Sequence, residues 1–438
     1  MRIDQNVCSK MWTDTNIDFK QKTLRHCCKQ ELQHVSIEEI KKLGKNVFEK
    51  YEQNLKNRYD MLFNNTIPDS CRQCKGEDSI RHVWNIWDDE RVNRLRDYLM
   101  HGTETHYIEL DLGISCNLAC IYCGPWSSTM WAKEMGLKNV NSHNKHAFNK
   151  RLDPKIPPVK FDTYEEEWDY LIKKYLPEWV DTLKKDTLLT LNLLGGEPLM
   201  MPETYEIIED LIPIARKFEK KPQIMLTTNL ATKPIMLERM LKLLDDTKDV
   251  FAWHFAVSIE DIGRRAELVR YHMKWENFMD NLKQIKPRAD YLLFTNTLSI
   301  VSYPFFHEWL DWVFDEMQGY NYDTQWALST NYVQSDGKSD YSYTDLAYLL
   351  PEQIDQNLIL ETFNKHIQKH TIPNTSMRIE QFREHIRNMN NRLGTKTVDM
   401  KFLNFWHDMS RRRNTDYINE VEPLKYLVDR YHDLQSRH

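Results

Sequence analysis

The sequence predicts an α/β fold with a mostly parallel sheet, a small cysteine-rich module before it and a helical extension after it. Three observations predict this. Strand-like and helix-like segments alternate through the middle of the chain, all eight cysteines lie within the first 123 residues, and the residues beyond Gly337 follow helical patterns. Such alternation is typical of βα units that form a parallel sheet, open or closed into a partial barrel.

Six apolar segments of strand length define the sheet. We expect strands at His106–Ile114, Thr187–Leu194, Gln223–Leu230, Phe251–Glu260, Tyr291–Ser302 and Asp323–Val333. Helical periodicity predicts helices between them at Thr204–Phe218, Pro234–Leu244, Arg264–Ile285 and His307–Met317. An insertion at about 137–184 interrupts this order, and Pro177 should kink its helix or start a second one.

The same patterns divide the chain into three predicted domains: a cysteine-rich module at 1–104, the α/β part at 105–335 and the helical extension at 336–438. Within the first domain, apolar residues at helical spacing predict one helix over Ser36–Met61. Ser36, with Glu39 three positions later, is a suitable cap for its start.

Composition limits the possible partners and compartment. The chain has 438 residues, and 59 Lys and Arg against 65 Asp and Glu give a net charge of −6. A nucleic-acid-binding surface usually shows clustered excess basic charge, so a nucleic-acid partner is not expected. No apolar run of signal-peptide or transmembrane length occurs. Clustered cysteines in a large intracellular chain usually hold metal or do redox chemistry. We therefore expect a soluble, cytoplasmic, metal-binding protein without membrane association.

The loop after the first predicted strand carries the most informative motif, Cys116-x3-Cys120-x2-Cys123. Three thiolates at this spacing can hold three irons of a 4Fe–4S cluster and leave the fourth iron open to another ligand. A zinc site or three packed thiols is the alternative. Zinc usually takes four ligands, and no further Cys or His lies within the loop, which favours iron.

A second motif follows the second predicted strand and reads Gly195-Gly196-Glu197-Pro198. Two adjacent glycines, in a chain with only 12, let the backbone pass close to a ligand, and Glu197 can accept a hydrogen bond from an ammonium group. A plain turn is the commoner meaning of Gly-Gly alone. The position directly after a strand, and after the cysteine loop in chain order, favours a ligand-binding role.

With these two motifs, residues 106–335 resemble the radical S-adenosylmethionine (SAM) enzymes. The resemblance implies a partial (β/α)6 radical SAM barrel that reductively cleaves SAM to a 5′-deoxyadenosyl radical, which then abstracts hydrogen from a substrate. It assigns the cluster ligands as Cys116, Cys120 and Cys123. It assigns SAM contacts to Tyr122 near the adenine and to Gly195, Gly196, Glu197 and Pro198. A low-potential electron donor is an implied partner.

Further positions match the family in chain order. Asn229 ends the third predicted strand, where the family often has Thr-Asn-Gly, and Leu230 replaces the glycine. Ser258 and Glu260 end the fourth, where the family often has Ser-x-Asp, and they would reach the ribose of SAM. Arg270 matches an arginine that often meets the SAM carboxylate; an exposed charge on a helix is the alternative.

The remaining cysteines resemble an auxiliary cluster module of the twitch or SPASM type. The resemblance implies a second 4Fe–4S cluster held by four of the five N-terminal cysteines: Cys8, one of Cys27 and Cys28, Cys71 and Cys74. Zinc is the alternative, because four cysteines with a C-x2-C half also suit zinc. Such modules often accompany peptide modification, so a peptide or protein substrate is implied. The alternatives are a radical SAM enzyme for a small molecule, such as a sugar or nucleoside, and a non-enzymatic zinc-binding scaffold.

Two weaker features lie outside these motifs. The run Arg411-Arg412-Arg413 can bind an anionic partner, although such a run is usually a solvated helix face. Trp126 and Trp131 follow the cluster loop and would shield it from water. No catalytic acid, base or radical-quenching residue stands out in the sequence.

Overall fold

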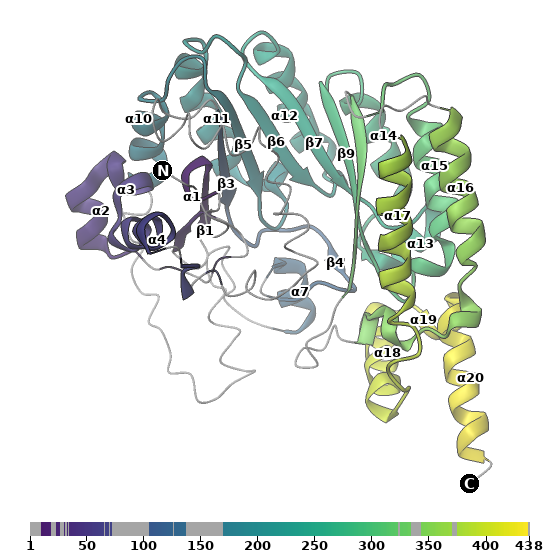
Figure 1. Cartoon of the computed structure of the whole chain (residues 1–438). Coiled ribbons are helices and arrows are strands. Elements are labelled where there is room, and N and C mark those ends of the chain that lie inside the picture. The colour runs from purple at the N-terminus through teal and green to yellow at the C-terminus, as the bar shows by residue number, and fades with distance from the viewer. Residues whose placement is uncertain are drawn as a thin grey trace. The chain divides into compact units, whose positions relative to one another are not determined.

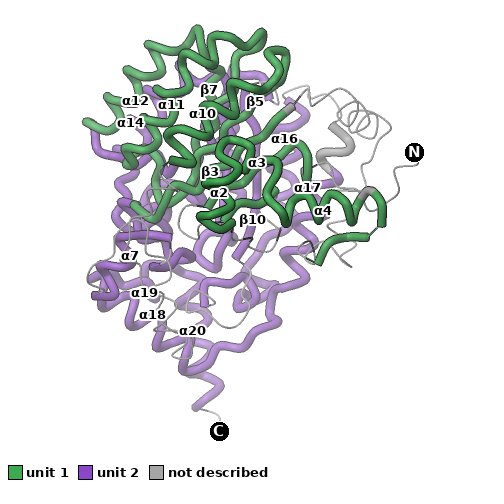
Figure 2. The backbone as a smooth tube through the Cα atoms, turned by 90° about the vertical axis from the view of Figure 1, so that its left-hand side faces the viewer, with its two compact units in different colours: residues 1–115, 140–227, 235–254 green, residues 116–139, 228–234, 255–438 purple. Residues whose placement is uncertain are grey.

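The computed structural model has an α/β fold with a mostly parallel sheet, as the sequence predicts (Figure 1). It describes residues 10–18, 23–26, 30, 33, 35–64, 66–69, 71, 105–125, 127–136, 170–322, 325–333, 343–369 and 375–436. The chain divides into two compact units (Figure 2). The first unit comprises 1–115, 140–227 and 235–254, and the second comprises 116–139, 228–234 and 255–438.

Most described strand pairs are parallel. In the first unit the hydrogen-bonded order is β6-β5-β3-β1-β2, in which β1 and β2 are antiparallel and the other pairs are parallel. In the second unit the order is β10-β9-β7, and a separate antiparallel pair joins β4 to β8. The division between the units falls within β7, after His254. The strands are β1 (Asp14–Asp18), β2 (Thr23–Arg25), β3 (Thr105–Asp111), β4 (Ala119–Cys120), β5 (Leu188–Leu194), β6 (Gln223–Thr228), β7 (Ala252–Ser258), β8 (Arg270–Tyr271), β9 (Tyr291–Leu298) and β10 (Trp326–Tyr332).

Several strands bury apolar residues at every second position. In β5, Leu189, Leu191 and Leu193 are buried, whereas Thr190 between them is only partly covered. β9 alternates in the same way over its whole length. Successive side chains of a strand point to opposite faces, so this period places the leucines in the apolar core and leaves the other face more polar.

All six predicted strands are present, with shorter ends than expected. The third was expected to reach Leu230, but β6 ends at Thr228 because Leu230 has a left-handed φ of 51°. The fifth was expected to reach Ser302, but β9 ends at Leu298. Apolar composition continues past the point at which the backbone leaves the sheet, so composition alone overestimates strand length.

Several predicted helices are confirmed. Pro177, which was expected to kink its helix or to start a second one, lies in the first turn of α10, directly after the π-helix η3. The described α-helices and the π-helix η3 are α1 (Lys10–Thr13), α2 (Ile37–Leu43), α3 (Val47–Lys50), α4 (Glu52–Phe63), α7 (Thr129–Glu134), η3 (Leu171–Tyr175), α10 (Leu176–Val180), α11 (Pro202–Ala215), α12 (Pro234–Thr247), α13 (Gly263–Val269), α14 (Trp275–Ile285), α15 (Phe306–Glu316), α16 (Gln356–Lys369), α17 (Thr375–Asn390), α18 (Met400–Arg413), α19 (Tyr417–Glu420) and α20 (Glu422–Ser436).

The prediction of one helix over Ser36–Met61 was wrong. The cap is correct, because the Ser36 hydroxyl accepts a hydrogen bond from the Glu39 amide at 3.1 Å. The helix then breaks at Gly44, whose φ is 53°, and at Tyr51, whose backbone is extended. Gly44 takes a left-handed φ at little cost, so it ends α2 although the apolar periodicity continues.

The prediction of one helix over Arg264–Ile285 was also wrong. Helix α13 ends at Val269, and Arg270–Tyr271 then form β8, which pairs with Ala119–Cys120 of β4. His272 follows with a φ of 78° before α14 begins. A pairing with residues some 150 positions away, such as Cys120 with Arg270, leaves no trace in helical periodicity.

The two ends of the chain contribute differently. The N-terminal segment supplies β1 and β2, and β1 pairs in parallel with β3. The described residues from 343 onward are mostly helical. The domain boundaries at 104 and 335 remain predictions. Among the described residues, no helix has the length and apolar character needed to cross a membrane.

Candidate functional site

The first turn of α7 holds the start of the cysteine loop. The Thr129 hydroxyl accepts from the Cys116 amide at 3.2 Å and donates to the Cys116 carbonyl at 3.0 Å. Ser128, the N-cap of α7, donates to the Leu118 carbonyl at 2.5 Å and accepts from the amides of the helix's first turn. Two adjacent hydroxyl side chains therefore fix both the helix start and the loop backbone.

The middle of the loop is fixed at Cys120. The indole Nε1 of Trp131 donates to the Cys120 carbonyl at 2.7 Å. On β4, Cys120 pairs with Arg270 of β8. Trp131 is itself buried and supports the loop through this hydrogen bond, whereas its shielding of a cluster stays a prediction. Trp126 lies outside the described residues.

The three loop thiols have different surroundings. Cys116 and Cys120 are buried, and Cys123 is half-buried. The Leu118 amide lies 3.5 Å and the Asn229 Nδ2 3.8 Å from the Cys116 sulfur. Hydrogen-bond donors aimed at cysteine sulfurs stabilise thiolates and tune the metal that they hold.

Arg270 supplies a charged donor to Cys120, since its Nη1 lies 3.8 Å from the sulfur. Burial nevertheless raises the pKa of the Cys120 thiol to about 12, with Arg270 acting in the opposite direction. The metal-free thiol is therefore neutral at physiological pH. A bound metal ion would deprotonate it, so metal binding would release a proton.

The chemistry of the loop fits a metal cluster, because it offers three thiols and donors to two of their sulfurs. Within the part of the chain that the structure describes, however, no three Cys, His, Asp or Glu side chains are grouped closely enough to hold a metal ion.

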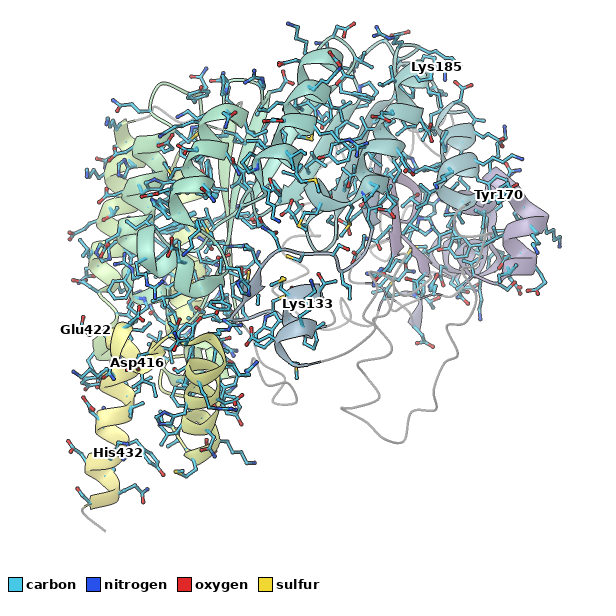
Figure 3. The ribbon with its side chains drawn as sticks, turned by 180° about the vertical axis from the view of Figure 1, so that it is seen from behind. Lys133, Tyr170, Lys185, Asp416, Glu422 and His432 are labelled. Carbon is cyan, nitrogen blue, oxygen red and sulfur yellow. The ribbon has the colours of Figure 1, made fainter. Side chains whose placement is uncertain are left out.

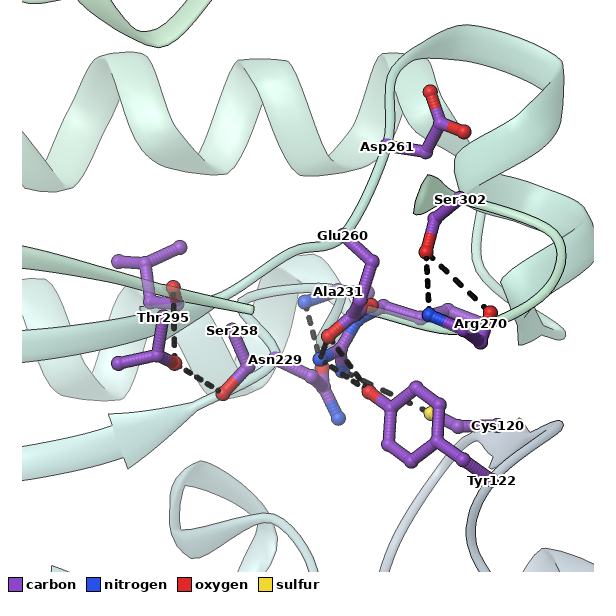
Figure 4. A network of polar contacts seen from close by, with 12 residues as sticks. Cys120, Tyr122, Asn229, Ala231, Ser258, Glu260, Asp261, Arg270, Thr295 and Ser302 are labelled. Atoms are coloured by element: carbon purple, nitrogen blue, oxygen red, sulfur yellow. Dashed lines mark hydrogen bonds and ion pairs between the residues drawn. The ribbon is translucent and has the colours of Figure 1, made fainter. Parts of the chain in front are cut away.

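A buried polar network brings Tyr122, Glu260 and Arg270 together (Figure 4). Arg270 Nε and Nη2 donate to the two carboxylate oxygens of Glu260, each at 2.6 Å. The Tyr122 hydroxyl donates to Glu260 Oε1 at 2.7 Å and accepts from Arg270 Nη2 at 2.9 Å. Burial raises the pKa of Tyr122 well above its usual value, so this hydroxyl stays protonated.

The network settles the environment of Arg270. The alternative of an exposed helix charge was wrong, because Arg270 lies on β8 and its side chain is 6% exposed. Glu260 holds it in a bidentate ion pair, and a shorter Asp at this position would have less reach toward the guanidinium. Two of its three guanidinium nitrogens face Glu260, and the third faces Cys120.

Asn229 lies against the start of the cysteine loop. Its Nδ2 donates to Asn117 Oδ1 at 2.9 Å, and its Oδ1 accepts from the Ala231 amide at 2.8 Å. Asn117 in turn donates to the Ala231 carbonyl at 2.8 Å. Leu230 adopts the left-handed backbone that a glycine would favour at this position, and its carbonyl accepts from Asn281 at 2.9 Å.

Ser258 lies at the end of β7, where its hydroxyl accepts from the Thr295 hydroxyl at 3.2 Å. The neighbouring Asp261 is fully buried and pairs with Arg265 at 3.0 Å. Burial raises the pKa of Asp261 to about 7, against the opposing effect of Arg265. Ser258 is the last residue of β7, and Glu260 lies two residues beyond it, so both lie at the strand end where the sequence predicts them.

The strand-end glycines in the first unit approach backbone closely. The Gly196 amide donates to the Gly113 carbonyl at 2.8 Å, and the Glu197 amide donates to the Ser115 carbonyl at 2.7 Å. A Cβ on Gly196 would lie 2.3 Å from the Ser115 oxygen, and one on Gly195 would lie 2.9 Å from the Gly113 oxygen. The two glycines thus allow close packing on the segment that leads into Cys116.

Glu197 and Pro198 begin the short turn after these glycines. Glu197 is fully buried, and its carboxylate accepts from the Leu199 amide at 3.2 Å. Pro198 is the first residue of a 3₁₀ turn, a position that suits a residue without an amide hydrogen. The carboxylate therefore helps to fix the turn, whatever further ligand it takes.

Of the N-terminal cysteines, Cys8, Cys27, Cys28 and Cys74 lie outside the described residues. Cys71 is described and is half-buried. The second cluster therefore remains a prediction.

Sequence reasoning missed the residues that support the loop from α7. Ser128 and Thr129 had a readable signal, because adjacent Ser and Thr before an apolar helical run are typical of a helix start. Asn117 and Glu134 had none, because their partners lie more than 100 residues away in the sequence.

Residues 112–297 match the model of the radical SAM superfamily. The match indicates a radical SAM domain in the middle of the chain and leaves the exact reaction open. No curated protein sequence matches the chain.

Several solved structures of radical SAM enzymes are similar to part of the chain. Histidine-tagged anSMEcpe with bound AdoMet aligns at 15% identity and a TM-score of 0.37, over 60% of this chain and 58% of that one. Streptococcus suis SuiB bound to the precursor peptide SuiA aligns at 11% identity and a TM-score of 0.36, over 76% of this chain and 60% of that one. The chain therefore spans less than two thirds of either protein, and at these scores the likeness does not bear on its substrate.

Proposed function

We propose that the protein is a radical SAM enzyme that binds a 4Fe–4S cluster at Cys116, Cys120 and Cys123. When bound with SAM, this cluster would supply the reductive cleavage that generates a 5′-deoxyadenosyl radical. The observation that carries the proposal is the cysteine loop within the matched domain. Two of its thiols are buried, and hydrogen-bond donors face their sulfurs.

The chain's own residues prepare this loop for a metal. Thr129 and Trp131 fix its backbone at Cys116 and Cys120. Arg270 places positive charge beside the Cys120 sulfur, which favours the thiolate once a metal has replaced the proton. Burial of these groups excludes water, which protects reactive intermediates from side reactions.

For SAM we propose the residues that the family resemblance assigns. Tyr122, Glu260 and Arg270 form one network, in which Arg270 keeps a nitrogen directed toward Cys120 rather than toward Glu260. Asn229 and Ser258 lie at the ends of β6 and β7, where parallel-sheet enzymes usually bind ligands. In the first unit we propose the same role for the strand-end residues Gly195, Gly196, Glu197 and Pro198.

We propose a peptide or protein substrate. One feature that supports it is β10, which is the last strand in the order of the second unit. Among the described strands it pairs only with β9, and Trp326 is its only fully buried residue. An extended peptide can add to such a strand edge through main-chain hydrogen bonds.

For the N-terminal cysteines we propose the auxiliary 4Fe–4S cluster, with zinc as the alternative occupant. A low-potential electron donor would reduce the first cluster. We place the protein in the cytoplasm, because a reducing compartment keeps clustered cysteines available for metal.

The test is the metal content after anaerobic reconstitution, measured as iron, acid-labile sulfide and zinc per chain. Two clusters predict about eight irons, falling to about four when Cys116, Cys120 and Cys123 are changed together to Ala. Reductive cleavage of SAM to 5′-deoxyadenosine should be lost in that variant. Cys71→Ala is the matched control, because it should remove the other cluster and leave SAM cleavage in place.

Other results would change the proposal. About four irons with one zinc would keep the radical chemistry and make the N-terminal site structural. Zinc alone, with no SAM cleavage, would contradict the proposed function and favour the scaffold alternative. Stimulation of SAM cleavage by a sugar or nucleoside, and not by peptides, would replace the peptide substrate with a small molecule.

A further inference from the structure

The basic run at the end of α18 has an unexpected environment. Arg411 is 78% exposed on its side chain, as a solvated helix face predicts, but the Arg413 side chain is fully buried. Arg413 Nε donates to both carboxylate oxygens of Glu134, at 3.1 and 3.2 Å. Glu134 is the last residue of α7, the helix whose first turn holds the cysteine loop. The prediction of a solvated face was therefore wrong for Arg413.

Arg413 is also enclosed by aromatic rings. Its guanidinium carbon lies 4.8 Å from the ring centroid of Trp131 and 4.6 Å from that of Tyr271. Its Nη1 donates to the Tyr417 hydroxyl at 3.0 Å, whereas its buried Nη2 has no hydrogen-bond partner among the described residues. The rings offset part of the cost of burying this cation through cation–π attraction.

Both aromatic residues also contact the backbone at or next to Cys120. Trp131 donates to the Cys120 carbonyl, and Tyr271 pairs with Ala119, the residue before Cys120, on β4. The Tyr271 hydroxyl also donates back to the Arg413 carbonyl at 3.0 Å. Arg413 thus contacts Trp131, which holds the Cys120 carbonyl, and Tyr271, which pairs with the residue before Cys120.

We propose that Arg413 is a positioning residue through which the C-terminal helices hold the cysteine loop at Cys120. The contacts run from Arg413 to Glu134 and Trp131 on α7, and from Arg413 to Tyr271 on β8. All of these residues belong to the second unit. In Figure 3, α7 can be found by Lys133, and the turn that follows α18 by Asp416. This inference goes beyond the proposed function, because it concerns how the loop is held in the metal-free chain.

Arg412 strengthens the same attachment. Its Nη1 donates to Glu134 Oε1 at 2.6 Å, and its Nε donates to Asp408 at 2.8 Å. Glu134 therefore receives two arginines of one helix. Arg411, by contrast, pairs with Asp408 of its own helix and is a matched control on the same turn.

The experiment measures thiol alkylation in the metal-free, full-length chain, followed at each cysteine by mass spectrometry. Arg413→Gln should raise the alkylation rate of Cys120 about tenfold or more relative to Cys71, because local opening of the loop exposes a buried thiol. Arg413→Lys keeps the charge but not the planar fork, so it should restore only part of the protection. Arg411→Gln should leave both rates as in the unchanged chain.

A second variant guards against global unfolding. The pair Arg413→Gln with Glu134→Gln leaves no uncompensated charge and should still expose Cys120 selectively. Equal increases at Cys120 and Cys71, which lie in different units, would show general unfolding and overturn the proposal. Unchanged protection of Cys120 in folded Arg413→Gln would also overturn it. Since no metal is present, neither result depends on whether the chain cleaves SAM.

Discussion

The strand end at Gly195–Pro198, in the first unit, and the loop at Cys116–Cys123, in the second, carry the two motifs that the sequence analysis identified, and they are held by different means. Backbone contacts fix the first, because the Gly196 and Glu197 amides bond to carbonyls of Gly113 and Ser115. Side chains fix the second, since Thr129, Trp131 and Arg270 reach it from other elements. A segment that is fixed by backbone contacts should be disturbed by a single Cβ added to one of its glycines. A segment that is fixed by side chains should be disturbed by the loss of one hydrogen-bonded or charged side chain.

The largest effect is expected in the side-chain network. Glu260→Gln or Arg270→Met alone should lower the free energy of unfolding by about 3–5 kcal/mol, because each leaves the partner's charge buried and less compensated. Chemical denaturation measures this. Arg216→Gln, in an exposed ion pair with Asp249, is the control and should leave the midpoint unchanged.

The double variant Glu260→Leu with Arg270→Met sharpens this result. Removing both charges should recover much of the lost stability, because no unpaired charge remains. A double variant that loses the sum of the two single effects would contradict the network as described.

An intermediate effect is expected in the backbone-fixed segment. Gly196→Ala should cost about 1–3 kcal/mol, because its Cβ would lie 2.3 Å from the Ser115 oxygen and backbone would have to shift. Hydrogen exchange should show the Glu197 amide losing protection. In Gly319→Ala no atom of the described residues lies within 4 Å of the added carbon, so this variant should show only the cost of its left-handed φ of 91°. Unchanged protection at Glu197 in Gly196→Ala would mean that close approach does not fix this segment.

The smallest change in the free energy of unfolding, when it is counted for a single pH unit, is expected from the titration of His106. This residue lies on β3, the strand that leads toward Gly113. Burial, followed by Arg58, lowers the pKa of His106 to about 3. The unfolded histidine titrates near 6.5, so it binds a proton below that pH while the folded one does not. The contribution of neutral His106 to the free energy of unfolding should therefore be complete above about pH 6.5. It should fall as the pH drops toward about 3, by up to about 1.4 kcal/mol per pH unit.

His106→Gln should flatten this part of the pH dependence, and the exposed His407→Gln should not. His26, whose pKa burial also lowers to about 3, should leave a residual slope. An identical pH profile for His106→Gln and the unchanged chain would show that His106 is not held neutral in the folded state.

Much of the fold was readable from the sequence because its strands are short apolar segments, of which β6 and β9 bury every second residue. The six strands and most intervening helices of the α/β part follow from such local patterns. The breaks at Gly44 and after Val269 do not. The first depends on a left-handed backbone within a continuous apolar pattern, and the second on a pairing with β4.

The candidate site divides in the same way. Spacing marked Cys116, Cys120 and Cys123 as candidate metal ligands and the strand-end glycines as a candidate ligand contact, and the family resemblance assigned their roles. Both motifs lie within residues 112–297, which match the radical SAM model. The role of each site residue stays a prediction.

The sequence by itself determined the α/β order, the cysteine motif and the glycine-rich strand end, since each is encoded within a few consecutive residues. Only the tertiary structure decided that Glu260 faces Arg270, that Trp131 holds the Cys120 carbonyl and that Arg413 is buried. The physical reason is that charge burial and long-range hydrogen bonds depend on which distant segments meet. The helix and strand propensities of short segments do not show which distant segments come into contact.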